Sequence, residues 1–250
     1  MPLPAALDTS IQTIPLLNLA IAVIPVAALI VILHRWTLNA AHASYGVLRM
    51  LVQLMLIGYL LAFIFESDSG WITAVVLLVM VIAASWIALG TMPEQRYKLF
   101  GYALISIVIA GGLTLLLVTQ LVLSLSSWYS PQHVIPLAGM IFATAMNSIS
   151  LSVERLTAEL SRDVEYNEAR GIALNAALIP ILNSLFAVGL VSLPGMMTGQ
   201  ILSGVSPFIA ARYQIMVMCM LFTASGFSAI LFLIAAKSSI LQIQSSTEAE

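Results

Sequence analysis

The sequence has very little charge. Only 8% of its 250 residues are Asp, Glu, Lys or Arg, whereas 61% are hydrophobic. A soluble domain carries roughly 25% charged residues. The apolar runs are too many and too long for a water-soluble core, because about 20 apolar residues suffice to cross a bilayer as a helix. The composition therefore predicts an all-α, polytopic integral membrane protein.

The chain also lacks the residues of most catalytic and metal sites. It has one cysteine, Cys219, which excludes an internal disulfide and a multi-cysteine metal site, and its three histidines are scattered. The motifs H-E-x-x-H, G-x-S-x-G and the phosphate loop G-x-x-x-x-G-K-[ST] do not occur. We therefore expect no catalytic residue, no bound cofactor and no nucleic-acid partner, and any ATP hydrolysis would belong to another subunit. The sequence identifies no metal ligand.

Seven apolar stretches are long enough to span a membrane. They cover about residues 11–33, 47–65, 71–90, 102–124, 134–153, 172–192 and 213–236. Asp8 and no basic residue precede the first stretch, and Arg35 follows it. It is therefore predicted to be a membrane anchor and not a cleaved signal peptide. We expect residues 1–250 to form a single transmembrane domain surrounded by membrane lipid.

Basic residues predict the orientation of the spans. With the N-terminus outside and the C-terminus in the cytoplasm, Arg212 is the one basic residue left outside, and the cytoplasmic segments hold Arg35, Arg49, Arg96, Lys98, Arg155, Arg162, Arg170 and Lys237. An eighth span at 193–211 would score equally well. Its prolines and glycines make a poor lipid-facing helix and favour an outer loop, with a short helix or a re-entrant dip.

The one sizeable polar insert is 154–171, ERLTAELSRDVEYNEARG, which this orientation places in the cytoplasm. Apolar residues recur there every four positions and predict an apolar stripe on a charged helix. Such a helix could dock into a groove on a soluble partner, or the insert could be a solvated hairpin that only joins two spans. The candidate docking residues are Leu156, Glu159, Leu160, Arg162 and Val164.

Amides and a hydroxyl stand out inside the fifth and sixth spans: Asn147, Asn175, Asn183 and Ser184. An intramembrane amide needs a partner or water, and Pro180 frees a carbonyl one turn back. Lining a cavity, these side chains could ligate a cation or bind a polar solute. Facing a neighbouring helix, they would be helix–helix contacts that contribute about 0.6 kcal/mol each.

The segment VGLVSLPGMMTGQILSGVSP (188–207) resembles the signature of the FetB-type family, also called UPF0014. AARYQIMVM (210–218), ALIP (177–180) and VIPLAGMI (134–141) match in order and position. The likeness covers roughly the last half of the chain, and the first half matches in span pattern and length. The family comprises permease subunits of ABC transporters linked to bacterial iron export, and it is related to plant membrane proteins of aluminium tolerance.

The resemblance implies a multi-pass permease of the bacterial inner membrane. It would work as a homodimer with two copies of a separate ATP-binding cassette subunit, onto which 154–171 would dock. The exported substrate would be a metal ion, iron by resemblance, or a small solute. Motion of 154–171 would reorient the sixth and seventh spans around a path lined by Asn147, Asn175, Asn183 and Ser184.

This chain departs from the family pattern in three places. The docking segment lacks the string Gly-Ala-(Thr or Ser)-Pro that family members tend to carry. Asn175, Asn183 and Phe186 stand where members often have Arg, Asp and Lys, and Ala143-Thr144 replaces a Gly-Asn pair. The changes leave the fold expectation intact and put the substrate in doubt.

Two further interpretations stay open from the sequence. The outer loop could act as a gate or hinge through Pro194, Gly195, Gly199 and Gly204, although glycines in a tight loop need no such role. The chain could also be a secondary carrier driven by an ion gradient, or a non-transporting scaffold that recruits a soluble protein. A carrier usually needs buried Asp, Glu or Lys for proton coupling, which the spans lack, and no repeated half is evident.

Overall fold

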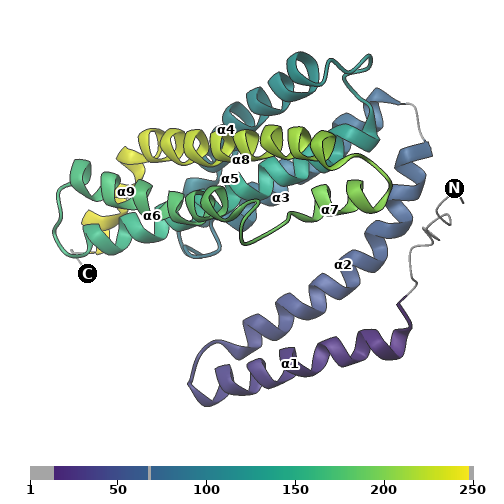
Figure 1. The fold of residues 1–250 in the computed structure, drawn as a ribbon. Helices are drawn as coiled ribbons and strands as arrows, with labels where there is room; N and C mark the ends of the chain where they lie inside the picture. The colour runs from purple at the N-terminus through teal and green to yellow at the C-terminus, as the bar shows by residue number, and fades with distance from the viewer. Residues whose placement is uncertain (1–13, 67–68, 248–250) are drawn as a thin grey trace, which may run out of the picture. The chain divides into compact units, whose positions relative to one another are not determined.

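The structure is a computed structural model that describes residues 14–66 and 69–247. Figure 1 shows the order α1 (Leu16–Arg35), α2 (Ala40–Glu66), α3 (Gly70–Ala88), α4 (Arg96–Leu116), the π-helix η1 (Leu117–Val122), α5 (Pro131–Leu160), α6 (Tyr166–Ala187), α7 (Gly195–Leu202), α8 (Pro207–Ala235) and α9 (Lys237–Thr247). No β-strand forms in these two ranges. The all-α prediction is confirmed.

Seven helices of the described chain are long and apolar enough to cross a membrane, which confirms the predicted number of spans. They are α1, α2, α3, α4 with η1, α5, α6 and α8. The segment 193–211 is not an eighth span, because α7 has only 8 residues and Pro207 begins the next helix. Asp8 and positions 11–13 of the first predicted span lie outside the described residues.

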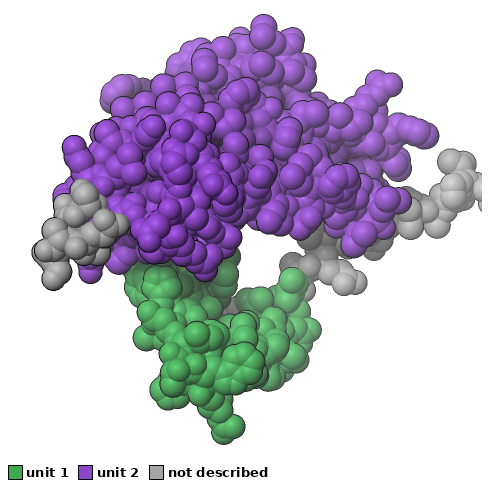
Figure 2. All heavy atoms as spheres, turned by 90° about the vertical axis from the view of Figure 1, so that its left-hand side faces the viewer, with its two compact units in different colours: residues 1–66 green, residues 67–250 purple. Residues whose placement is uncertain are grey.

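The chain divides into two compact units, residues 1–66 and 67–250, which Figure 2 colours separately. In the first unit α1 and α2 form a helical hairpin. Ala40 and Ile64 are the buried residues among the described side chains of these two helices. The two helices therefore bury little of their apolar surface against each other. The single transmembrane domain of residues 1–250 stays a prediction.

α5 is the central helix of the second unit and packs against α3, α4, α6 and α8. Ile141, Ala145 and Ile149, at successive turns of α5, are fully buried. α4 approaches α5 closely at Gly111, where an added Cβ would lie 3.1 Å from the side chains of Ile141 and Phe142. Small residues allow such approach between membrane helices, where tight packing drives association.

The insert 154–171 is not a separate helix. Its first part is the last turns of α5, residues 161–165 form a turn with Asp163 at φ 61°, and its last part begins α6. Leu156 is 0% exposed and Leu160 4% exposed, and Val164 packs against the same core. In the structure this apolar stripe therefore packs within the chain's own core, and docking of 154–171 onto a partner stays a prediction.

This turn is fastened to the C-terminal end of the bundle. The Tyr166 hydroxyl donates a hydrogen bond to the carbonyl of Leu233, and the Lys237 ammonium lies 5.0 Å from the centroid of the Tyr166 ring. Gln244 Nε2 donates to the carbonyl of Leu160 over 2.7 Å. These contacts tie the α5–α6 turn to α8 and α9. Figure 1 shows the α5–α6 turn and α9 at the end of this unit opposite α7.

Candidate functional site

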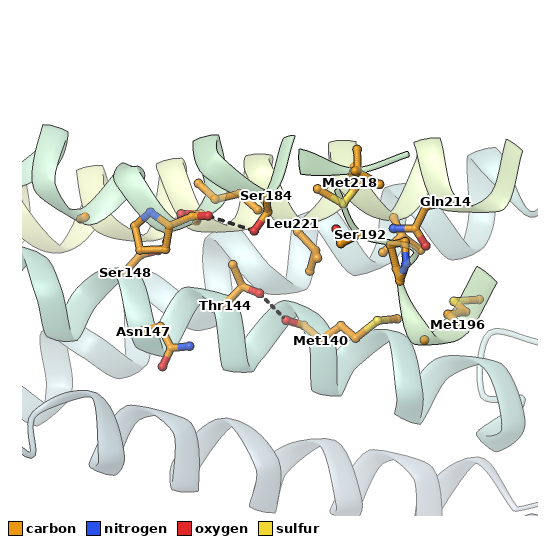
Figure 3. A pocket seen from close by; sticks show the side chains of 18 of the residues that line it. Met140, Thr144, Asn147, Ser148, Ser184, Ser192, Met196, Gln214, Met218 and Leu221 are labelled. Carbon is orange, nitrogen blue, oxygen red and sulfur yellow. Dashed lines mark hydrogen bonds between the residues drawn. The ribbon is translucent and has the colours of Figure 1, made fainter. Parts of the chain in front are cut away.

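A cavity of about 450 Å³ lies between α5, α6, α8 and the segment 188–196 (Figure 3). Its polar lining consists of hydroxyls and amides, namely Thr144, Asn147, Ser148, Ser184, Ser192, Gln214 and Ser225. Its remaining walls are apolar, with the thioethers of Met140, Met196 and Met218 among them. The cavity therefore offers many neutral polar groups inside a membrane bundle.

α5 contributes one face of the cavity through residues three or four positions apart. Met140, Thr144, Asn147 and Leu151 follow this spacing, which aligns side chains on one side of a helix. The Thr144 hydroxyl donates to the carbonyl of Met140 over 2.9 Å, so its lone pairs remain free to accept. Asn147 is exposed and lines the cavity, and its role in a substrate path stays a prediction.

α6 turns a different face to the cavity than the sequence analysis expects. Pro180, Ile181 and Ser184 line the cavity, and the Ser184 hydroxyl donates to the carbonyl of Pro180 over 2.9 Å. Asn175 and Asn183 do not line it, although both are exposed. Asn147 and Ser184 are thus brought together at one site, while the other two amides lie on another face of α6.

The chain between α6 and α7 closes one end of the cavity with a tight turn. Gly189 adopts φ 83°, and its N–H donates to the carbonyl of Ser192 over 2.9 Å. A side chain would strain this left-handed conformation, which glycine adopts readily. The turn brings Ser192 and Met196 into the wall.

The four residues expected to form a hinge have different conformations. Gly204 lies at φ 87° just after α7, Pro194 precedes α7, and Gly195 and Gly199 are helical within it. A Cβ added at Gly195 or Gly199 would meet nothing within 4 Å, so no close approach requires glycine there. The hinge stays a prediction, and among these four residues Gly204 has the backbone conformation that favours glycine.

Gln214 is not among the residues predicted from the sequence, and it lines the cavity from the first turns of α8. It is only 6% exposed, and its Oε1 atom has no hydrogen-bond partner among the described residues. An unsatisfied buried acceptor costs about 1–3 kcal/mol. The orphaned oxygen is therefore a place where a bound cation or a donor from a solute would be stabilised. The signal in the sequence was its position as the one amide of the seventh predicted span.

The described residues that line this cavity include no charged side chain. In the described ranges, moreover, no group of three or more His, Cys, Asp or Glu residues is placed to hold a metal ion. The cavity therefore offers hydrogen-bond acceptors, dipoles and thioethers, and it has no group suited to acid–base catalysis near neutral pH. Such groups can bind a polar solute or a cation.

A second groove, of about 700 Å³, runs between α4, η1 and α8. Its lining is almost wholly apolar, and Arg212 is the one charged residue among the described residues that line it. Apolar side chains with a single charged group suit contact with lipid better than the binding of a polar substrate. The cavity between α5, α6 and α8 is therefore the candidate functional site.

Comparison with known proteins agrees with this architecture. Residues 16–241 match the model of the uncharacterised protein family UPF0014. The chain is 34% identical over 232 residues to the probable iron export permease protein FetB of Escherichia coli, covering 86% of this chain and 87% of that one. It is 36% identical over 197 residues to the UPF0014 membrane protein slr1647 of Synechocystis, covering 73% and 76%. No solved structure gives a significant match.

A plant protein is also similar to this chain over most of its length. The chain is 33% identical over 233 residues to the protein ALUMINUM SENSITIVE 3 of Arabidopsis thaliana, covering 82% of each chain. The family model covers most of the chain, and the relatives match over most of their own length. With its seven apolar helices, the chain therefore belongs to the UPF0014 family of multi-pass membrane proteins.

Proposed function

We propose that the chain is the transmembrane permease subunit of an ABC transporter in the bacterial inner membrane. It exports a metal ion or a small solute through the cavity between α5, α6 and α8, with ATP hydrolysed by a separate subunit. The observation that carries this proposal is the buried, unpaired Gln214 oxygen on a polar cavity within a membrane bundle. The name of the Escherichia coli relative makes iron the first substrate to test.

The positive-inside rule predicts how the helices are oriented in the membrane. It assigns the α5–α6 turn and α9 to the cytoplasm and α7 to the outer side. Gln214 and Met218 line the cavity from the first half of α8, nearer α7 than α9. In this orientation the cavity lies toward the outer side of the membrane. An export site from which bound substrate leaves to the outside would have this position.

Force from an ATPase would enter at the α5–α6 turn. Arg162 in this turn is exposed, and its guanidinium lies 3.5 Å from the buried carboxylate of Glu159, which Arg155 also approaches to 2.6 Å. Through Tyr166 and Leu233 the turn is hydrogen-bonded to α8, the helix that carries Gln214. Among the predicted docking residues, Arg162 is therefore the one positioned to meet a partner.

A second copy of the chain would cover the exposed face of α6. Asn175, Ile179 and Asn183 lie four residues apart and so share one exposed face, followed by Phe186, which is 78% exposed. Amides that face lipid lack hydrogen-bond partners. A two-fold axis that runs beside α6 and parallel to it would pair the amides of one copy with those of the other. This face is the homodimer contact that we propose.

The test is to purify the tagged full-length chain from its own membranes in mild detergent and to identify what co-purifies. An ATP-binding subunit is expected with the native chain. Replacing Arg162 with Glu should release it. Arg212→Glu, a matched reversal of an exposed arginine at the other end of the bundle, should retain it. A well-folded chain that brings no ATPase would contradict the proposal and favour a carrier or a scaffold.

A further inference from the structure

Three methionines reach the cavity from three separate elements. Met140 comes from α5, Met196 from α7 and Met218 from α8, and Figure 3 shows the side chain of Met140 extending along α5 toward Met196. Gln214, with its unpaired buried oxygen, belongs to the same wall. The cavity thus combines thioether sulfurs with a buried amide oxygen that has no partner among the described residues.

Packing alone does not account for this arrangement. Methionine commonly fills irregular gaps in a closed core, but Met196 is 38% exposed and lines an open cavity. A core that needed only filling would also have no reason to bury the amide of Gln214 without a hydrogen bond. Both observations are explained if a ligand occupies the cavity and contacts sulfur and oxygen together.

The charge of the lining limits the charge of that ligand. The described lining residues include no carboxylate to balance a cation, and the desolvation energy of an ion grows with the square of its charge. A divalent ion would therefore lose about four times as much solvation energy as a monovalent ion of the same size. Hard cations also prefer carboxylate, carbonyl and water oxygens. A monovalent cation fits this neutral site best.

The chemistry of the side chains that line the cavity also limits which class of monovalent cation it would bind. Thioethers are soft ligands, which select Cu(I) over hard ions. We propose that this site binds a soft monovalent cation of the Cu(I) and Ag(I) class through Met140, Met196 and Met218, with Gln214 Oε1 as the oxygen ligand. The inference rests on the proposed function, because it names the substrate class of the same cavity.

Neutral ligands also suit a transport site. They bind an ion without the strong electrostatic trap that a carboxylate would create, and release requires binding that is not too tight. The cavity is about 450 Å³, far larger than a bare ion, and water takes about 30 Å³ per molecule in the liquid. The ion therefore has room to enter with water or a small carried ligand and to exchange it for sulfur.

The test is calorimetric titration of Ag(I) and Fe(II) into the purified full-length chain. Cys219→Ala is the background, because that exposed thiol would itself bind silver. One Ag(I) should bind per chain, more tightly than Fe(II). Met140→Leu, Met196→Leu and Met218→Leu preserve volume, and each should weaken silver binding at least tenfold. Met55→Leu, which changes a methionine exposed on α2, is the matched control and should bind as the parent does.

Gln214→Glu provides a second, independent readout. It adds a negative charge to the wall of the cavity that the three methionines line, and it should shift preference toward Fe(II), with the fold checked by thermal unfolding. Silver binding that is absent, or that survives all three methionine changes, would overturn the inference. Tighter Fe(II) than Ag(I) binding in the parent would overturn it and leave the permease proposal standing. Absence of an ATPase partner would overturn the permease proposal alone, since these titrations use the isolated chain.

Discussion

The two ends of the second unit are built in opposite ways. At the α5–α6 turn, Tyr166, Lys237 and Gln244 bind the turn to α8 and α9, and Leu156 is fully buried. At the α7 end, Leu190 and Val191 are 90% and 85% exposed, and α7 packs against α8. The first end is thus held by contacts between helices, and the second is largely exposed. Under the proposed function the first would transmit movement from the ATPase, and the second would open and close beside the cavity.

The largest difference in stability between the two ends should appear when one leucine at each end is replaced by alanine. Leu156→Ala creates a void in the core and should destabilise the protein by about 2–5 kcal/mol. Leu190→Ala, at a 90% exposed position, should change stability by less than about 0.5 kcal/mol. Thermal unfolding of both variants in the same detergent measures the difference. Equal shifts would mean that the two ends are packed alike.

Tyr166→Phe tests whether the hydrogen bond at the turn fastens it to α8. The change leaves the Leu233 carbonyl buried without its donor and should cost about 1–3 kcal/mol. Hydrogen exchange should accelerate around the α5–α6 turn and the end of α8, and not in α3. Tyr97→Phe, at a hydroxyl-bearing ring that is 81% exposed, is the control. Unchanged exchange would show that the turn is held by other contacts.

Gln214→Leu should separate stability from function. It removes an unsatisfied buried acceptor and should raise stability, by at most about 1–3 kcal/mol. Substrate-stimulated ATPase activity of the assembled transporter should fall, because the cavity loses its orphaned oxygen. Gln214→Asn, which shortens the side chain and keeps the amide, should have the weaker effect on activity. A variant that is destabilised and fully active would contradict the role assigned to Gln214.

The smallest effect is expected on the exposed face of α6. Asn183→Leu removes an amide that does not line the cavity, so it should weaken the homodimer by only about 0.6 kcal/mol for the lost hydrogen bond. Cross-linking gives a sharper readout in the Cys219→Ala background. Ile179→Cys on this face should form disulfide-linked dimers, whereas Leu113→Cys, at an exposed position of α4, should not. The reverse pattern would place the dimer contact on α4.

The cavity illustrates what sequence reasoning could and could not find. Asn147 and Ser184 were found because amides and hydroxyls are rare in apolar spans. Asn175 and Asn183 share that property, but the face each one occupies depends on how α6 is rotated against α5 and α8. Met196 could not be found, because a methionine in an apolar segment indicates packing, and only the position of α7 shows that it lines the same cavity as Gln214.

The docking segment shows the same limit. Its charge and its spacing of leucines indicated a cytoplasmic helix with one apolar face, and that face exists. Whether Leu156 and Leu160 meet a partner or the chain itself was undecided, since both outcomes bury the same apolar area and gain the same solvation energy. In the structure they face inward, because α5 extends to Leu160 and both leucines continue its buried face, on which Val153 also lies.

The sequence by itself determined that this protein is a helical membrane protein with seven spans, because hydrophobic length alone decides whether a helix can cross a bilayer. It also identified the family, through a long string of unusual residues between Val188 and Pro207. The tertiary structure decided which polar groups meet. The rotation and packing of α5, α6 and α8 are long-range properties, and they alone bring Gln214 and three methionines to one cavity.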